Sequence, residues 1–224
     1  MTPENTRRPY NLALVYQEVL TAIERFRANR QNVSDAESFR HHMREALKTA
    51  SSEALATGYP ADDVKLATFA TVAFLDESIL NSQNPVFADW RRETLQHELF
   101  GTFIAGELFF QNLQALLGRN DSPDLGDLIE VYYLCLVLGF LGKYSAGDRG
   151  ELARILSATA QKLRRIRGPF NGLSPTWKLP NEKVHTMGDP WVKRLGIIAG
   201  AMAGLMVLMF IIYKLVLNSG VRIA

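Results

Sequence analysis

The sequence has a single cysteine, Cys135, among its 224 residues, so an internal disulfide and a disulfide-built secreted scaffold are both excluded. It also lacks a large excess of either charge. The 25 Lys and Arg residues face 23 Asp and Glu, and a net charge of +2 excludes a strongly basic nucleic-acid binder. No alternating strand pattern and no internal repeat is present. Residues 1–9 contain no apolar segment, so we expect no signal peptide.

Motifs for catalysis are missing as well. The sequence contains no Gly-rich phosphate loop, no GxSxG elbow and no HExxH pair. A di-iron helical protein needs two Glu-x-x-His pairs, and the sequence has one, Glu182 to His185, in a Pro-rich segment. Cys135 lies in an apolar run, where a buried thiol is favoured over a nucleophile. The sequence therefore predicts no catalytic residue, no metal and no cofactor; a membrane-tethered helical metalloenzyme is the alternative from another class.

A long apolar run stands near the end of the chain. From Leu195 to Tyr213 there are 19 consecutive residues without a charge. As a helix this run spans about 28 Å, close to the roughly 30 Å hydrocarbon core of a bilayer. Lys and Arg are more frequent before the run than after it, which places the N-terminal side in the cytoplasm. We therefore expect a tail-anchored protein with a transmembrane helix over residues 191–217 and a short periplasmic tail over 218–224.

Small residues recur at a spacing of four within this apolar run. They are Gly196, Ala199, Gly200, Ala203 and Gly204. Because small side chains let two membrane helices approach closely, the pattern favours a homodimer or packing on another membrane helix. The alternative is that Gly and Ala are simply common in membrane helices.

Residues 1–167 are expected to form an all-α cytoplasmic domain, since apolar residues recur there at helical spacing. The expected helices cover residues 10–29, 34–57, 60–81, 86–100, 103–117, 128–141 and 150–167. Ser34 and Glu37 form a capping box at the start of the second. The run 128–141 is too short to cross a bilayer, so it predicts a buried core helix. Residues 168–190 hold four of the nine prolines and predict a linker to the anchor.

Three carboxylates stand in apolar surroundings. Asp76 and Glu77 end the most apolar stretch of the third expected helix, and Glu107 lies within another apolar segment. Buried carboxylates are costly unless they are hydrogen-bonded or paired. One interpretation is that they accept hydrogen bonds from loop amides and hold the bundle together. The other is that they line a groove that binds a partner.

Charge is unevenly distributed along the chain. Residues 60–142 hold 4 basic and 12 acidic groups, whereas residues 143–194 hold 11 basic and 4 acidic groups. The acidic part is free to meet a basic partner. The anionic cytoplasmic leaflet attracts the basic part, with a solvated helix face as the alternative. Since no aromatic residues are interleaved for stacking, no nucleic-acid partner is expected. The candidate membrane-surface residues are Lys162, Arg164, Arg165, Arg167, Lys193 and Arg194.

Several spaced motifs resemble the DotU/TssL family, and the resemblance covers roughly residues 10–213. They are FLDE at 74–77, Trp90, Phe100, GELFF at 106–110, LIEVYYLCL at 128–136, GFLGKY at 139–144, and the run from Gly150 through Arg167 to Leu173 and Trp177. With Trp90 added from this signature, the candidate partner-binding cleft comprises Asp76, Glu77, Trp90 and Glu107.

The resemblance implies a cytoplasmic domain of about eight helices in two bundles shaped like a hook, followed by one inner-membrane helix. It implies a structural component of the type VI secretion system that docks the baseplate of the contractile tail to the membrane complex. A component of the related type IVB system is the alternative. The implied partners are a TssM (IcmF-like) inner-membrane protein, baseplate components, a second copy of the chain and inner-membrane lipids. Many members add a periplasmic peptidoglycan-binding domain; this short form is expected to reach the cell wall through a partner.

Overall fold

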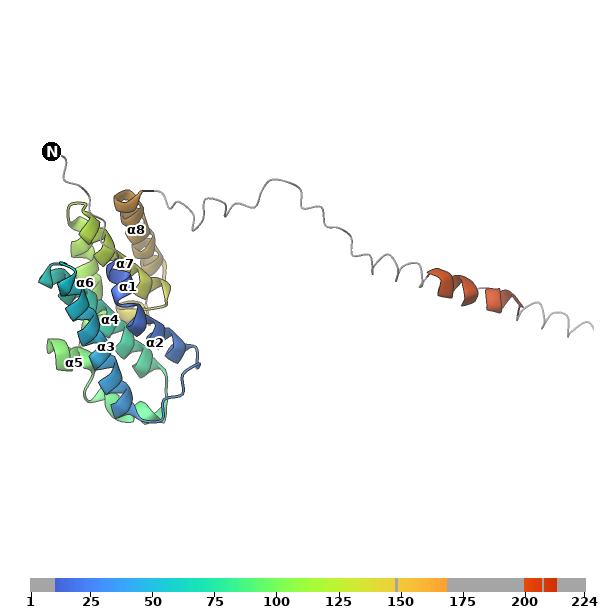
Figure 1. Ribbon diagram of the computed structural model, residues 1–224, viewed down its shortest axis with the longest axis horizontal. Coiled ribbons are helices and arrows are strands. Elements are labelled where there is room, and N and C mark those ends of the chain that lie inside the picture. The colour runs from blue at the N-terminus through green and yellow to red at the C-terminus, as the bar shows by residue number, and fades with distance from the viewer. Residues whose placement is uncertain (1–10, 148, 169–199, 207, 213–224) are drawn as a thin grey trace, which may run out of the picture. The chain divides into compact units, whose positions relative to one another are not determined.

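The structure is a computed structural model that describes residues 11–147, 149–168, 200–206 and 208–212. Every regular element in these ranges is a helix, so the all-α prediction is confirmed (Figure 1). The chain divides into two compact units, Met1–Phe170 and Asn171–Ala224. The helices of the first unit are α1 (Leu12–Val15), α2 (Gln17–Arg27), α3 (Ala36–Ala56), α4 (Ala61–Asn81), the 3-10 helix η1 (Pro85–Arg91), α5 (Leu95–Phe100), α6 (Ala105–Gly118), α7 (Pro123–Val137), the 3-10 helix η2 (Gly142–Tyr144) and α8 (Arg149–Arg167).

Helix α4 forms the centre of the first unit. Helices α2, α3, α5, α6 and α7 all contact it, because its residues from Leu66 onward are nearly all apolar or small. Phe74 and Leu75 are completely buried, and burying such a side chain contributes about 1.5–3 kcal/mol. The buried hydroxyl of Thr71 donates to the Ala67 carbonyl oxygen one turn earlier at 2.9 Å. This hydroxyl is therefore buried in the central helix with a hydrogen-bond partner.

The first expected helix is two helices in the structure. Tyr16 separates α1 from α2, with φ −89° and ψ 6°. Its side chain is completely buried, and its phenolic oxygen lies 2.6 Å from Thr68 Oγ1 on α4. The expected helix over residues 10–29 was wrong in its continuity, because packing of Tyr16 onto α4 overrides the helical period.

The expected helix over residues 86–100 was also wrong. The structure has η1 followed by the separate helix α5. Thr94 is the N-cap of α5, with its hydroxyl oxygen accepting from the His97 amide at 3.4 Å. The capping box is shifted by one residue too, since Asp35, not Ser34, caps α3 by accepting from the Ser38 amide at 2.9 Å. Both differences concern helix ends, which the apolar period does not determine.

Helix α7 is a core helix, as its sequence indicates, but the expected bounds 128–141 were wrong, because the Ser122 cap starts it earlier and it ends at Val137. The helical stretch Pro123–Tyr144 is the one described stretch with the length and mean hydropathy of a membrane span. However, α7 contacts α1, α4, α6 and α8, and Leu128 and Ile129 are completely buried. Helix α8 packs very closely on α7: a Cβ on Gly126 would lie 2.9 Å from Cγ2 of Ile166.

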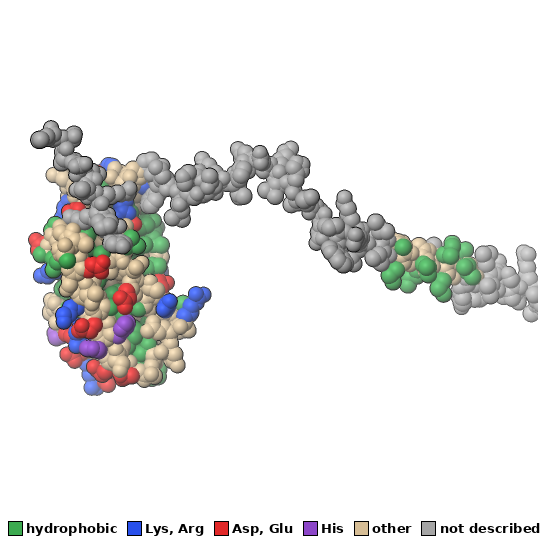
Figure 2. Space-filling view, viewed as in Figure 1, with side chains coloured by type: hydrophobic (Ala, Val, Ile, Leu, Met, Phe, Trp, Pro, Cys, Tyr) green, Lys and Arg blue, Asp and Glu red, His purple; other side chains and the backbone are tan. Residues whose placement is uncertain are grey.

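In the second unit, the described residues 200–206 and 208–212 are helical. The apolar helix is Gly200–Ile212, within the run predicted to cross the membrane. Figure 2 shows hydrophobic side chains along it, and Met206 is 76% exposed. Residues 168–190 lie outside the described residues apart from Gly168, and so does most of the expected span 191–217.

Candidate functional site: the α5–α6 corner

Asp76, the first candidate of the partner-binding cleft, is a buried capping group. Its side chain is 1% exposed and sits on α4. Oδ1 accepts a hydrogen bond from Trp90 Nε1 at 2.8 Å, and the two oxygens accept from the amides of Leu95 and Gln96 at 3.2 and 2.7 Å. These amides belong to the first turn of α5, whose N–H groups have no partner within the helix. Asp76 therefore attaches both η1 and the start of α5 to the central helix.

Glu77 holds a different segment. Its carboxylate accepts hydrogen bonds from the amides of Leu141 and Gly142, at 2.9 and 2.5 Å. Gly142 has φ 49°, a left-handed conformation that favours glycine, and so this turn can present both amides to one carboxylate. Burial raises the pKa of Glu77, while the two amide hydrogen bonds and Arg27 oppose that rise. Neighbouring carboxylates of α4 thus fix the start of α5 and the turn at 141–142, two segments that are far apart in the sequence.

The two fixed segments both contact the start of α6. The buried Gln96 accepts at Oε1 from the Ala105 amide at 2.8 Å, which ties the start of α5 to the start of α6. A Cβ on Gly106 would lie 3.1 Å from the Cα of Gly142, so α6 rests directly on the turn that Glu77 holds. We call residues 99–107 the α5–α6 corner. Asp76 holds the α5 side of this corner, and Glu77 holds the turn that contacts its α6 side.

The α5–α6 corner exposes large apolar side chains. Leu99 is 41% exposed, Phe103 is 60% exposed and Ile104 is 56% exposed. The Phe103 ring is stacked on the His97 ring, with centroids 4.1 Å apart. Glu107 is also exposed, and its Oε1 accepts from Gln111 Nε2 at 3.4 Å. A cluster of exposed large apolar residues beside an acidic group is typical of an interaction surface.

Sequence reasoning named Glu107 but missed its apolar neighbours, since Phe103 and Ile104 were placed inside an expected helix over residues 103–117. In the structure Ile104 is the N-cap of α6, and Gly101, with φ 66°, ends α5. Glycine at that position is the signal that could have revealed a corner, because it ends a helix in a left-handed conformation.

Trp90 belongs to the support of the corner. It is 2% exposed, and the guanidinium carbon of Arg40 lies 4.2 Å from its ring centroid. Arg40 Nη1 also pairs with Glu98 Oε2 of α5 at 3.2 Å, and Nη2 donates to the Glu93 carbonyl oxygen. This arginine connects α3, Trp90 and α5, and its positive charge lowers the cost of ionising Asp76. Of the four candidate cleft residues, the structure leaves Glu107 exposed with a hydrogen bond on its own helix, and it places the other three in hydrogen bonds between different segments of the domain.

The basic residues at the end of α8 are mostly engaged within the domain. Lys162 is 6% exposed, and its Nζ lies 2.6 Å from Asp121 Oδ1. Arg165 binds the same carboxylate through Nε at 2.6 Å. Nη2 of Arg167 lies 2.7 Å from Asp127 and 2.6 Å from Glu130. Of the four candidate basic residues on α8, Arg164 and Arg165 are exposed. The other two candidates, Lys193 and Arg194, lie outside the described residues.

The small residues of the apolar run are partly described. A Cβ on Gly200 or Gly204 would meet nothing within 4 Å, so both leave room for a neighbouring helix. Ala203 is exposed as well, and Gly196 and Ala199 lie outside the described residues. Among the residues that the structure describes, no cluster of three or more His, Cys, Asp or Glu side chains could hold a metal ion.

Comparisons with known proteins agree with this fold. The family model of the type VI secretion system protein DotU matches residues 11–216. The cytoplasmic domain of TssL from Acinetobacter baumannii is 28% identical, with a TM-score of 0.65 over 70% of this chain and 99% of that one. SciP/TssL from enteroaggregative Escherichia coli 042 is 23% identical, with a TM-score of 0.60 over 69% and 88%. DotU from Francisella novicida is 19% identical, with a TM-score of 0.56 over 66% and 98%.

A search of curated proteins finds no significant match. The family match covers nearly the whole chain, and the three solved structures share the helical fold of its first unit. The family is a structural component of a secretion system. The chain therefore belongs to the DotU family of type VI secretion system proteins.

Proposed function

We propose that this chain is a structural component of the type VI inner-membrane complex that docks the baseplate of the contractile tail. In this proposal the helical domain is cytoplasmic, and the apolar run from Leu195 to Tyr213 crosses the inner membrane as its anchor. A TssM-like inner-membrane protein, a second copy of the chain and inner-membrane lipids are its other partners. The family match supports this assignment, and the α5–α6 corner is the observation that carries the docking role.

The corner suits docking because it is both exposed and rigidly supported. A partner that covers Leu99, Phe103 and Ile104 removes apolar surface from water, which is the main favourable term in most protein associations. Asp76 and Glu77 hold the two sides of the corner, so little ordering is required when the partner binds. The single exposed carboxylate of Glu107 favours a partner that brings a basic side chain beside its apolar contact.

The test is co-purification of the full-length chain from membranes of cells that assemble a type VI system. The variant Phe103→Asp, Ile104→Asp places charges at the corner, and we expect baseplate proteins to be lost while the TssM-like protein is retained. Leu55→Asp is the matched control, since Leu55 is 49% exposed on α3. Phe103→Ala gives a second, milder variant in case the double variant folds poorly. Unchanged recovery of baseplate proteins with both corner variants would contradict the docking role.

The same co-purification separates the type VI role from the type IVB alternative. Recovery of type IVB components in place of baseplate proteins would establish the alternative. Self-association is tested by crosslinking in membranes. Gly200→Leu and Gly204→Leu are expected to reduce the dimer, and unaltered crosslinking would place the helix contact elsewhere.

A further inference from the structure

A groove separate from the α5–α6 corner runs between α1–α2 and the C-terminal half of α7. Its volume is about 800 Å³, and residues of both walls line it, including Leu14, Leu20, Leu134 and Leu138. Leu14 is 47% exposed although it stands in the first helix of the domain. Val137 is 52% exposed and follows Leu134 by three residues, so it lies on the same side of α7. The groove therefore offers apolar side chains from two helices to a partner.

The acidic groups of the groove lie beside arginines of the domain. Glu130 accepts a hydrogen bond from Asn11 Nδ2 at 2.8 Å and pairs with Arg167 Nη2 at 2.6 Å. Glu24 Oε1 lies 3.7 Å from Arg27 Nε. Glu130 shares Arg167 with Asp127, and Glu24 faces Arg27 at ion-pair distance without a hydrogen bond to its Oε1, so each carboxylate at the groove has a cation beside it.

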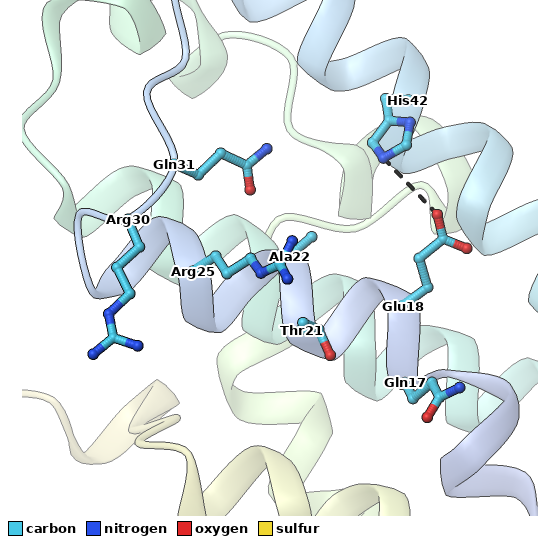
Figure 3. Close-up of a pocket in the computed structure, with 8 residues that line it drawn as sticks. All are labelled: Gln17, Glu18, Thr21, Ala22, Arg25, Arg30, Gln31 and His42. Carbon is cyan, nitrogen blue, oxygen red and sulfur yellow. Dashed lines mark ion pairs between the residues drawn. The ribbon is translucent and has the colours of Figure 1, made fainter.

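The arginines of the groove are different. Arg25 and Arg30 line it and are exposed, and within the described ranges neither forms an ion pair. Both also line the neighbouring hollow on the other side of α2, where Oε1 of Glu18 lies 4.0 Å from Nε2 of His42 (Figure 3). In that view the Arg30 side chain extends away from the Glu18–His42 pair. In the part of the chain that the structure describes, the lining charges without an ion-pair partner are therefore the positive ones of Arg25 and Arg30.

We propose that this groove binds an amphipathic helix of a partner protein whose apolar stripe enters between α1 and α7 and whose flanking residues are acidic. Helix-in-groove binding uses apolar residues at i, i+3 or i+4, and i+7. Leu134 and Leu138 are themselves one turn apart, so successive turns of the bound helix meet successive apolar side chains of α7. Carboxylates beside the stripe then face Arg25 and Arg30. Charge complementarity favours an acidic helix over a basic one.

The test uses the full chain in nanodiscs of zwitterionic lipid and three fluorescent model peptides of about 18 residues, which is about 27 Å of helix. One carries a Leu stripe flanked by Glu, the second has Lys in place of Glu, and the third has the first composition in scrambled order. Fluorescence anisotropy measures binding, with empty nanodiscs as background. We expect the acidic striped peptide to bind about tenfold more tightly than the other two.

Variants of the chain locate the binding. Leu14→Asp should weaken binding of the acidic striped peptide by about tenfold, since the substitution places a charge on the apolar wall of the groove. Arg25→Glu with Arg30→Glu should weaken binding of the acidic striped peptide by about fivefold and strengthen binding of the Lys peptide. The matched controls are Leu55→Asp on α3 and Arg92→Glu, whose side chain is 86% exposed, and both should bind as the wild type does. Circular dichroism verifies that every variant remains helical.

Three results would overturn the proposal. The first is equal affinity for the acidic, basic and scrambled peptides. The second is binding of phosphatidylglycerol vesicles that depends on Arg25 and Arg30 while the peptides do not bind, which would make the surface a lipid site. The third is a disulfide between Leu14→Cys residues of two copies that blocks the peptide, which would make it a contact of the homodimer. Loss of baseplate docking by corner variants is independent of all three results.

Discussion

The indole Nε1 of Trp90 donates a hydrogen bond of 2.8 Å to the carboxylate of Asp76, and neither side chain is more than 2% exposed. This bond joins η1 to the central helix within the protein interior. Burial raises the pKa of Asp76, and it outweighs the hydrogen bonds from Gln96, Trp90 and Leu95 that lower it. Such a carboxylate is tolerated because each donor around it would otherwise lack a partner. Because Asp76 also binds the first amides of α5, this buried pair helps to fix the position of the α5–α6 corner.

Asp76→Ala is expected to destabilise the domain by about 3 kcal/mol, because it leaves the Trp90 indole and two amides of α5 buried without an acceptor. Asp76→Asn keeps one acceptor oxygen and should cost less. Thermal unfolding of the full chain followed by circular dichroism measures both. Glu107→Ala, at an exposed carboxylate, is the control and should be nearly neutral. Equal unfolding temperatures for Asp76→Ala and the control would refute the buried capping role.

Gly142→Ala should be destabilising by about 1–3 kcal/mol for two reasons. Its φ of 49° is unfavourable for alanine, and the added Cβ would lie 2.6 Å from the carbonyl oxygen of Gly106. Gly118→Ala is the matched control, since a Cβ there meets nothing within 4 Å. Hydrogen exchange is the second readout: Gly142→Ala and Glu77→Gln should both raise amide exchange at residues 139–144. Unchanged exchange in both variants would contradict the support of this turn by Glu77.

Sequence reasoning predicted the elements whose burial follows from composition. The apolar stretch of α4 and residues 128–137 of α7 could be recognised as core helices, and Pro60 marked the start of α4. The five residues before this part of α7 and its end at Val137 could not. The interpretation that Asp76 and Glu77 accept hydrogen bonds from loop amides could be formulated from their apolar surroundings. Which amides they meet could not, because Gln96 and Gly142 are 20 and 65 residues away. A cap supplied by another helix leaves no local signal.

The charge distribution shows the same limit. The acidic part over residues 60–142 was interpreted as the surface for a basic partner, and the basic part over 143–194 as a membrane surface or a solvated helix face. In the structure, acidic residues at 121–130 form ion pairs with basic residues of α8. Part of the opposite charge of the two segments therefore holds α8 against the rest of the domain. The signal was present in the sequence as opposite charges in consecutive segments. Which residues meet depends on the close approach of α8 at Gly126.

Cys135 is expected to be unreactive toward thiol reagents in the folded chain. It is completely buried in α7, and burial raises the pKa of its thiol, so little thiolate forms and reagents cannot reach it. Labelling with a maleimide, read by mass spectrometry, should be slow under native conditions and complete in denaturant. Leu55→Cys, at an exposed position, should label rapidly in the same protein. Rapid native labelling at Cys135 would show that α7 opens readily.

Asp121 is expected to make the attachment of α8 dependent on pH. The hydrogen bonds and charges of Arg165 and Lys162 hold the pKa of Asp121 well below its usual value of 3.8. Because the folded-state pKa is depressed, the stabilisation is fully present above the unfolded pKa and is lost as pH falls below about 4. Asp121→Asn removes this contribution. Wild type should therefore exceed the variant in unfolding temperature at neutral pH, and the difference should shrink in acid.

The control for this prediction is Asp89→Asn. Asp89 lies 3.5 Å from Arg92, but both side chains are almost fully exposed, at 89% and 86%. Exposed pairs contribute little, so this variant should unfold close to wild type at every pH. The rate of proteolytic cleavage within α8 gives a second measurement. This rate should be raised in Asp121→Asn at neutral pH, and in wild type only in acid. A constant difference between wild type and Asp121→Asn from neutral to acidic pH would show that the ion pairs of Asp121 do not fasten α8.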